Sequence, residues 1–223
     1  MTKNNKDFAV LTGDLVKSSR LSAPELRQAM QSLRDAAKRF QAAFPGSVLG
    51  ELDVYSGDGW QMLMPDWRRS LRAAVFLRAT IKGEKNLKLD SRVAIAWGKV
   101  DQSSINPSRI SESTGEAFTE SGRALADMDR ETRMSLRAKA SMGIADTGIL
   151  SASVALLDNI VHRWKPAQAR AVSLSLLGHT QEQVAANLGV SQPTVHQAIQ
   201  GCGWHGISDL LTTVENIGKK SYK

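Results

Sequence analysis

The sequence predicts an α+β domain followed by a small all-α module. Over residues 8–98, short apolar runs of strand length alternate with amphipathic helical stretches. Residues 167–200 instead contain three closely spaced helical segments with no strand between them. Of the 223 residues, 42% are hydrophobic and 23% are charged, so the chain can bury a packed core and is neither mostly disordered nor fibrous.

The first two predicted elements are a buried strand and an amphipathic helix. FAVLTG, residues 8–13, is an apolar run that ends before Asp14. Ser22, with Glu25 three residues later, makes a capping box, which predicts the start of a helix. Apolar residues then recur at helical spacing until the Pro-Gly pair at 45–46 ends the helix.

A β-hairpin, a second helix and a further strand are expected next. Residues 48–55 and 60–64 are strand-like runs that flank Ser56-Gly57-Asp58-Gly59, a tetrapeptide typical of a hairpin turn. Asp66 can cap the second helix, and residues 92–98 form the strand. This β-α-β-β-α-β order is typical of a ferredoxin-like sheet with helices on one face. We expect the other face to stay open for a ligand or a partner.

Two more helices connect this sheet to the C-terminal module. A helix that begins near Gly115 carries apolar side chains toward the core, and the short strand MSLRA completes the domain. Residues 146–163 form a connecting helix. We therefore divide the chain into a sheet domain at 1–142, a connecting helix at 143–165 and a helical module at 166–223.

The C-terminal module has the pattern of a helix-turn-helix. Within VAANLGVSQPTVHQAI, Ala185 allows two helices to approach closely, Gly189 suits the tight turn and Ser191 begins the third helix. We predict that the module binds double-stranded DNA, with Arg170 on the phosphate backbone; the alternative is a packing module with a polar outer face. The residues expected to face the bases, where glutamine can pair with adenine, are Gln192, Thr194, His196, Gln197 and Gln200.

Charge and cysteine content limit the compartment and the partners. The net charge is +7, from 29 Lys and Arg against 22 Asp and Glu, which is compatible with a polyanionic partner. The single cysteine, Cys202, cannot form a disulfide within the chain and fits a reducing compartment. No apolar stretch approaches the roughly 18 residues that span a bilayer, and the chain does not begin like a signal peptide. We expect a cytoplasmic protein without a membrane partner.

Two aspartates predict a metal site. Asp14 follows the first strand and Asp58 lies at the hairpin tip, and these two strand ends are adjacent in the deduced sheet. Because close carboxylates repel, a divalent cation such as magnesium or manganese is expected between them. Such an ion takes further ligands from phosphate oxygens, which favours a nucleoside triphosphate or a related nucleotide as the shared ligand.

The loop after the first strand supplies cations and hydroxyls for these phosphates. The alternative is that both aspartates are turn-formers and that the loop is merely solvated. The loop residues assigned to nucleotide binding are Lys17, Ser18, Ser19 and Arg20.

Four segments carry a family resemblance. TGDLVKSS, YSGDGW, RVAIAWG and GEAFTESGRAL resemble the metal loop, the hairpin, the fourth strand and the catalytic helix of class III nucleotidyl cyclases. With the helix-turn-helix appended, the whole chain resembles a SatD family protein. The resemblance implies that Asp14, Asp58 and the main chain of Leu15 bind the metal. It also implies that Arg123 stabilises the transferred phosphate.

Two positions depart from the cyclase pattern. Thr119 stands where those enzymes have an asparagine in the catalytic helix, and Val54 replaces the lysine that reads adenine. A metal pair with altered substrate-reading positions favours a sensor. We therefore expect a homodimeric DNA-binding transcriptional regulator whose nucleotidyl-cyclase-type domain binds a metal-nucleotide. The alternatives are an active cyclase that makes a cyclic nucleotide from a nucleoside triphosphate, and an adaptor without either activity.

Overall fold

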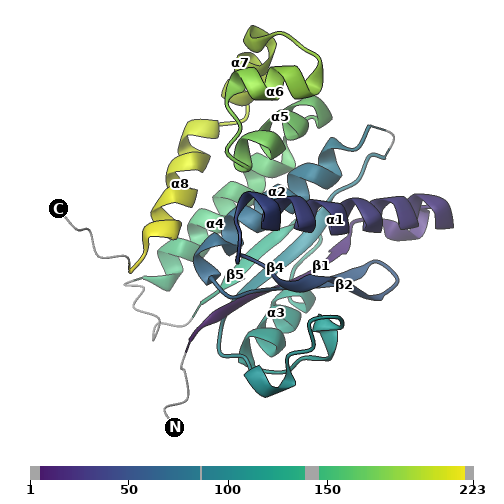
Figure 1. Cartoon of the computed structure of the whole chain (residues 1–223), viewed down its shortest axis with the longest axis vertical. Coiled ribbons are helices and arrows are strands. Elements are labelled where there is room, and N and C mark those ends of the chain that lie inside the picture. Colours follow the sequence, from purple (N-terminus) through teal and green to yellow (C-terminus); the bar gives the residue numbers. More distant parts are fainter. Residues whose placement is uncertain (1–5, 86, 139–145, 219–223) are drawn as a thin grey trace.

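The computed structural model describes residues 6–85, 87–138 and 146–218. Its centre is a five-stranded sheet with the strand order β2-β3-β1-β4-β5 (Figure 1). The central strand β1 runs antiparallel to β3 and β4, and β5 is parallel to β4. The predicted α+β fold class with its ferredoxin-like sheet is confirmed. The strands are β1 (Phe8–Leu15), β2 (Leu49–Ser56), β3 (Gly59–Met64), β4 (Ser91–Gly98) and β5 (Met134–Arg137).

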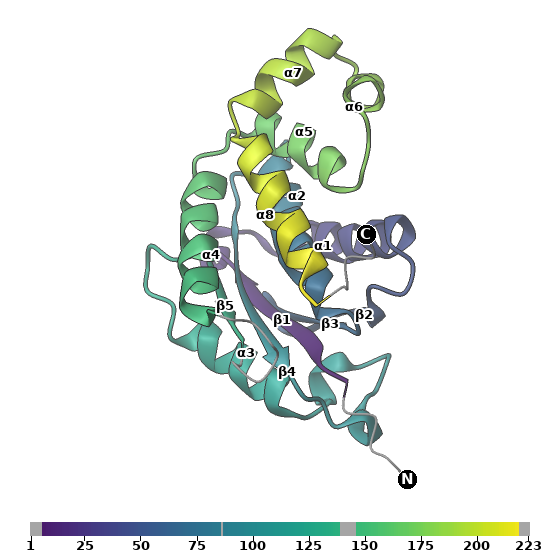
Figure 2. The same cartoon turned by 90° about the vertical axis from the view of Figure 1, so that its left-hand side faces the viewer.

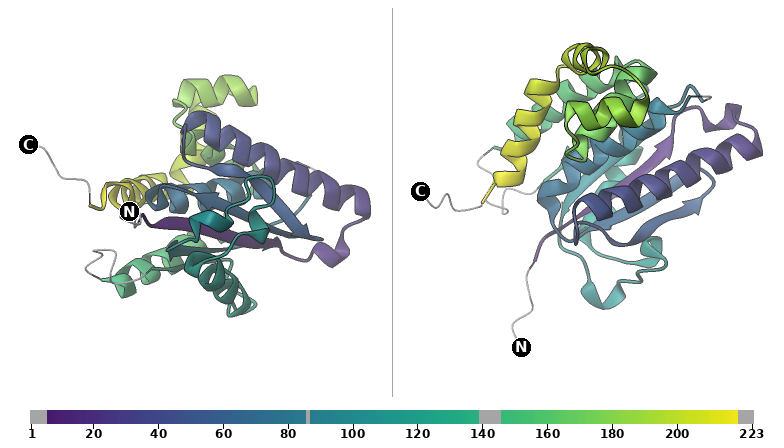
Figure 3. Two further views of the ribbon diagram at one scale, coloured as in Figure 1. Left: turned by 60° about the horizontal axis from the view of Figure 1, so that its bottom comes forward. Right: turned by 45° about the horizontal axis from the view of Figure 1, so that its top comes forward.

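Helices α1 (Ala23–Ala43) and α2 (Ser70–Gly83) pack on one face of the sheet and build the main core with it (Figure 3). The predicted capping box starts α1: the N–H of Ser22 donates to the Glu25 carboxylate at 2.8 Å, and the N–H of Glu25 donates to the Ser22 hydroxyl at 3.4 Å. Asp66 caps the short turn that leads into α2. Fully buried core residues include Leu11, Leu33, Phe40, Trp60 and Phe76.

The second face of the sheet is also covered, so the expectation of an open face was wrong. Helix α3 (Glu116–Ala126) lies across β1 and β4 on the side opposite to α1 and α2 (Figure 3). It packs Phe118 into a cluster with Val10 of β1. The end of this face stays partly accessible at Asp14 and Arg92, whose side chains are 20% and 32% exposed.

In the part of the chain that the structure describes, five helices follow β5 (Figure 2). Helix α4 lies alongside β5, and α5 packs against α2. Residues of α5 and α8 belong to the same core as the sheet, so the division into domains stays a prediction. None of the described helices has the length and apolar character needed to cross a bilayer. The five are α4 (Thr147–His162), α5 (Pro166–Leu176), α6 (Gln181–Leu188), α7 (Gln192–Gln200) and α8 (Trp204–Asn216).

A buried arginine ties the helices to the sheet. Arg78 of α2 is fully buried and bonds Asp90 at 2.9 Å and Asp158 at 2.6 Å. Asp158, in α4, also accepts the N–H of Met134 in β5 at 3.1 Å. Burial acts to raise the pKa of Asp90, but the charge and hydrogen bonds of Arg78, together with the charge of Lys82 and the N–H of Ser91, outweigh burial and leave this pKa below its ordinary value. The cluster therefore joins α2, α4 and the strand ends.

Candidate nucleic-acid interface and ligand edge

Helices α6 and α7 form the two arms of a helix-turn-helix. The Thr180 hydroxyl accepts the N–H of Gln183 at 3.3 Å and starts α6. Gly189 ends α6 in the left-handed conformation, with φ of 67°, which glycine adopts without a steric penalty. Ser191 then caps α7 through the N–H of Thr194 at 3.4 Å. With α5, the two arms enclose a small core of Ala171, Val184, Ala185, Val195 and Ile199.

The outer side of α7 is polar. The hydroxyl of Thr194 lies 2.8 Å from that of Ser191, so this residue takes part in the cap of the helix. A helix of this kind can lie in the major groove, where amide and imidazole groups bond base edges. All the residues predicted to face DNA are exposed: Gln192, Thr194, His196, Gln197 and Gln200.

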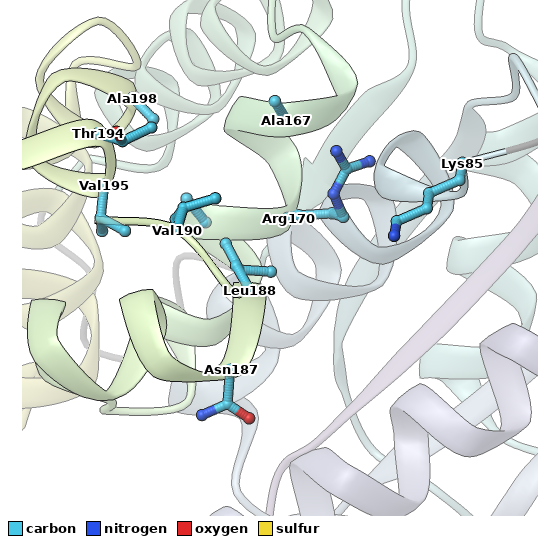
Figure 4. Close-up of a pocket in the computed structure, with 10 residues that line it drawn as sticks. Lys85, Ala167, Arg170, Asn187, Leu188, Val190, Thr194, Val195 and Ala198 are labelled. Carbon is cyan, nitrogen blue, oxygen red and sulfur yellow. The ribbon is translucent and has the colours of Figure 1, made fainter. Parts of the chain in front are cut away.

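Cations are missing from the helix-turn-helix itself. From residue 171 to residue 218 the sequence has no Lys and no Arg. The nearest described cations include Arg170 of α5 and Lys85, which follows α2. Both line a cavity of about 320 Å³, and Figure 4 shows them on one side of it with Leu188 and Val190 on the other. Positive charge near the two helices therefore comes from α5 and from the segment that follows α2.

Arg170 joins α5 to α2. Its guanidinium donates from Nη1 to the main-chain oxygen of Gly83 at 2.9 Å. Its stem packs so closely that a Cβ on Gly83 would lie 2.9 Å from the Cγ of Arg170. This contact positions the helix-turn-helix against the sheet domain, and the DNA-backbone role of Arg170 stays a prediction.

The predicted ligand edge includes Asp14, near the end of β1. Arg92 lies directly opposite in β4 and holds both carboxylate oxygens: Nε donates to Oδ1 at 2.9 Å, and Nη2 donates to Oδ2. The Ser91 hydroxyl donates to the main-chain oxygen of Asp14 at 2.6 Å. A Cβ on Gly13 would lie 2.4 Å from the ring of Trp60, so glycine is required there. Strand β4 thus fixes Asp14 through both its side chain and its main chain.

Asp58 lies in the turn between β2 and β3, and its charge affects the same residues as the charge of Asp14. The pKa of Tyr55 is raised first by burial and then by the charges of Asp14 and Asp58. The pKa of Arg92 is raised first by its hydrogen bonds to Asp14, against the effect of burial, and further by the charges of both aspartates. Two carboxylates, one guanidinium and one phenol are therefore within electrostatic reach of one another.

A divalent ion at these residues would compete with Arg92 for Asp14. In the described ranges, no three His, Cys, Asp or Glu residues come together as a metal site. Asp14 and Asp58 offer the oxygen ligands that magnesium and manganese prefer. However, Arg92 already bonds both oxygens of Asp14, so an ion would compete with this guanidinium for the carboxylate. Leu15, the third ligand implied by the resemblance, lies opposite Ser91 in the β1–β4 ladder.

The loop after β1 carries the residues predicted to bind phosphate. Lys17, Ser19 and Arg20 are exposed, and Ser18–Arg20 form a short 3₁₀ turn. Lys17 has a φ of 61°, and no other non-glycine residue in the described ranges has a positive φ. Such a conformation costs on the order of 1 kcal/mol, and the N–H of Arg20, which donates to the Lys17 oxygen at 3.0 Å, helps to hold it.

Thr119 and Arg123 lie on the exposed side of α3. The Thr119 hydroxyl donates to the main-chain oxygen of Gly115 at 3.3 Å, and Arg123 pairs with Glu120 at 2.9 Å. Among the hydrogen bonds and ion pairs of the described residues, none joins either side chain to the aspartate pair. The catalytic roles that the resemblance implies for them stay predictions.

Arg92 belongs to the edge, although the sequence did not identify it. The sequence predicted the strand RVAIAWG. Its one charged residue, Arg92, meets Asp14 only because of the antiparallel β1–β4 register. That register depends on long-range pairing, which no local pattern in the sequence specifies.

Comparisons with known proteins give a distant structural likeness. No family model matches the chain, and no curated protein matches it. Seventeen chains of solved structures match, including the guanylyl cyclase Cya2. That match has 14% identity and a TM-score of 0.42, and it covers 62% of this chain and 77% of that one. Membership of the SatD family stays a prediction.

Proposed function

We propose that this protein is a cytoplasmic DNA-binding transcriptional regulator of the SatD type. The observation that carries the proposal is the capped α6–α7 pair, whose second helix presents Gln192, Gln197 and Gln200 to solvent. Because residues 171–218 contain no Lys or Arg, one copy makes few phosphate contacts and binds double-stranded DNA weakly. A homodimer that reads two half-sites about 34 Å apart compensates for this weakness.

The proposed sensor is the edge that holds Asp14, Asp58 and Arg92, and its proposed ligand is a nucleoside triphosphate with magnesium or manganese. The two carboxylates would hold the ion, which supplies positive charge for phosphate oxygens. Once Asp14 binds an ion, the guanidinium of Arg92 can bond phosphate instead. Lys17 and Arg20, on the loop that follows β1, offer further positive charge.

Replacing Arg92 with alanine tests this exchange of partners. We expect Mn²⁺ alone to bind about tenfold more tightly, because the cation that competes for Asp14 is gone. We expect the affinity of the variant for Mn²⁺ with a nucleoside triphosphate to rise less than its affinity for Mn²⁺ alone, or to fall below that of the wild type, because a phosphate contact is lost. Electron paramagnetic resonance of free Mn²⁺ and calorimetry with the nucleotide measure the two affinities.

A matched control is Arg109→Ala, which removes an exposed arginine that pairs with Glu112 at 3.3 Å. This control should change neither affinity. If Arg92→Ala behaves like the control, the edge is not the sensor, and the DNA-binding half of the proposal is unaffected.

An active nucleotidyl cyclase makes a different prediction. After incubation of the full chain with each ribonucleoside triphosphate and manganese, we expect chromatography to return the nucleotide unchanged. A cyclic product that disappears in Asp58→Asn would replace the sensor with an enzyme. Loss of the product in Arg123→Ala would then assign phosphate stabilisation to that residue.

A further inference from the structure

Helix α4 carries apolar residues on its solvent-exposed side as well as on the side that packs into the core. Its outer side carries Ile149, Leu156 and Ile160, whose exposed fractions are 67%, 68% and 39%. Their spacing places them on one face of the helix, and Figure 2 shows that α4 lies at the edge of the molecule. The inner side, which packs into the main core, consists of Leu150, Val154, Leu157 and Val161.

Exposed charges occur only at the two ends of this helix. Between Thr147 and Val161 the one charged residue is Asp158, which is buried and bonded to Arg78 at 2.6 Å. Asp146, the N-cap, and Arg163, the C-cap, are exposed. In an ideal helix of 3.6 residues per turn, both fall in the same sector of about 120° as the three exposed apolar residues.

This outer side is complementary to itself in the antiparallel orientation. A two-fold axis that lies between two antiparallel copies of α4, level with the middle of the helix, would place Ile149 opposite Ile160 of the second copy. The reason is that the two residues lie equally far from the middle. For the same reason Asp146 would oppose Arg163 of the second copy. Apolar residues therefore meet apolar residues, and an acid meets a base at each end of the contact.

We propose that the outer side of α4 is an interface with a second copy of this chain, packed antiparallel. The proposal rests on the homodimer of the proposed function and assigns the surface that forms it. Near the axis, Ser153 would oppose Leu156, and a small residue facing a large one lets two helices pack closely. A two-fold contact of this kind uses the same patch on both copies.

The helix pair is a small interface. One pair of helices of this length buries less than the roughly 800 Å² per copy of a standard interface. The dimer therefore dissociates on dilution, and the two half-sites of a DNA site would stabilise it.

Sedimentation velocity of the full chain over a range of concentrations tests the interface. We expect the wild type to associate into dimers at micromolar concentrations, and Leu156→Glu to stay monomeric. Leu156 is exposed, so this variant should keep the wild-type circular dichroism and thermal midpoint. Val190→Glu, which changes an exposed apolar residue of the helix-turn-helix, is the control and should dimerise like the wild type.

A mixing experiment tests the antiparallel register. Ile149→Glu and Ile160→Lys should each impair dimerisation alone. A mixture of the two should form heterodimers, because the new acid faces the new base in one half and Ile160 faces Ile149 in the other. A merely structural effect of either substitution would not be rescued by mixing.

Two results overturn the proposal in distinguishable ways. A wild type that is monomeric throughout contradicts both this interface and a homodimer formed without DNA. A Leu156→Glu variant that dimerises like the wild type keeps the homodimer and excludes α4 as its interface.

Discussion

Replacing Arg78 with methionine is expected to lower the free energy of unfolding by about 3 to 5 kcal/mol, the cost of leaving buried charges without their partner. Arg78 is fully buried, and among the described residues its removal leaves Asp158, 9% exposed, without a cation. It leaves Asp90, 12% exposed, with only Lys82 of those residues, at 3.3 Å. Denaturant unfolding followed by circular dichroism measures the loss.

The matched control is Arg109→Met, which breaks the exposed pair with Glu112. Exposed pairs contribute about 0 to 1 kcal/mol, so this variant should unfold almost like the wild type. If both variants lose equally little stability, the buried cluster does not hold α2, α4 and the sheet together.

The pH dependence of this loss follows from Asp90. In the wild type the pKa of Asp90 is lowered, so its contribution to stability is present above the ordinary aspartate pKa and is lost as the pH falls through the lower folded value. Without Arg78, burial dominates and raises this pKa, so the folded variant favours the protonated acid. The stability difference between the two proteins should therefore shrink as the pH falls from 7 to about 4.

Much of the order of elements could be predicted because short-range patterns encode it. The capping box at Ser22 and Glu25 starts α1 in the structure as the sequence indicates. Gly189 likewise ends α6 at the predicted turn. Helix α8 was missed because its N-cap is Gly203, which makes no side-chain capping bond and leaves no polar start signal.

Less of the candidate site could be predicted, because its geometry depends on long-range packing. The apolar side of α3 shows that the helix is buried on one side, but not which face of the sheet it covers. The bond from Arg170 to Gly83 depends in the same way on how α5 docks on α2. The pairing of Asp14 with Arg92 depends on strand register. The sheet face that was expected to be open is therefore covered by α3. Arg170, expected to contact DNA, instead bonds the main chain of Gly83.

Replacing Gln197 with alanine is expected to weaken specific DNA binding by about 5- to 150-fold, which corresponds to the loss of a base contact worth about 1 to 3 kcal/mol. Gln197 is exposed on α7 and lies outside the small core of the helix-turn-helix, so the variant should fold normally. Gln28→Ala, an exposed glutamine on α1, is the matched control and should bind like the wild type.

The most direct test titrates the full chain against a duplex that the wild type has selected from random sequences, and against a scrambled duplex of the same composition. We expect the wild type to prefer the selected duplex, and Gln197→Ala to lose most of that preference. We also expect a shallow dependence of affinity on salt, because residues 171–218 contain no Lys or Arg. Equal binding of both duplexes by the wild type, or an unchanged preference in Gln197→Ala, would contradict a role of α7 in reading DNA.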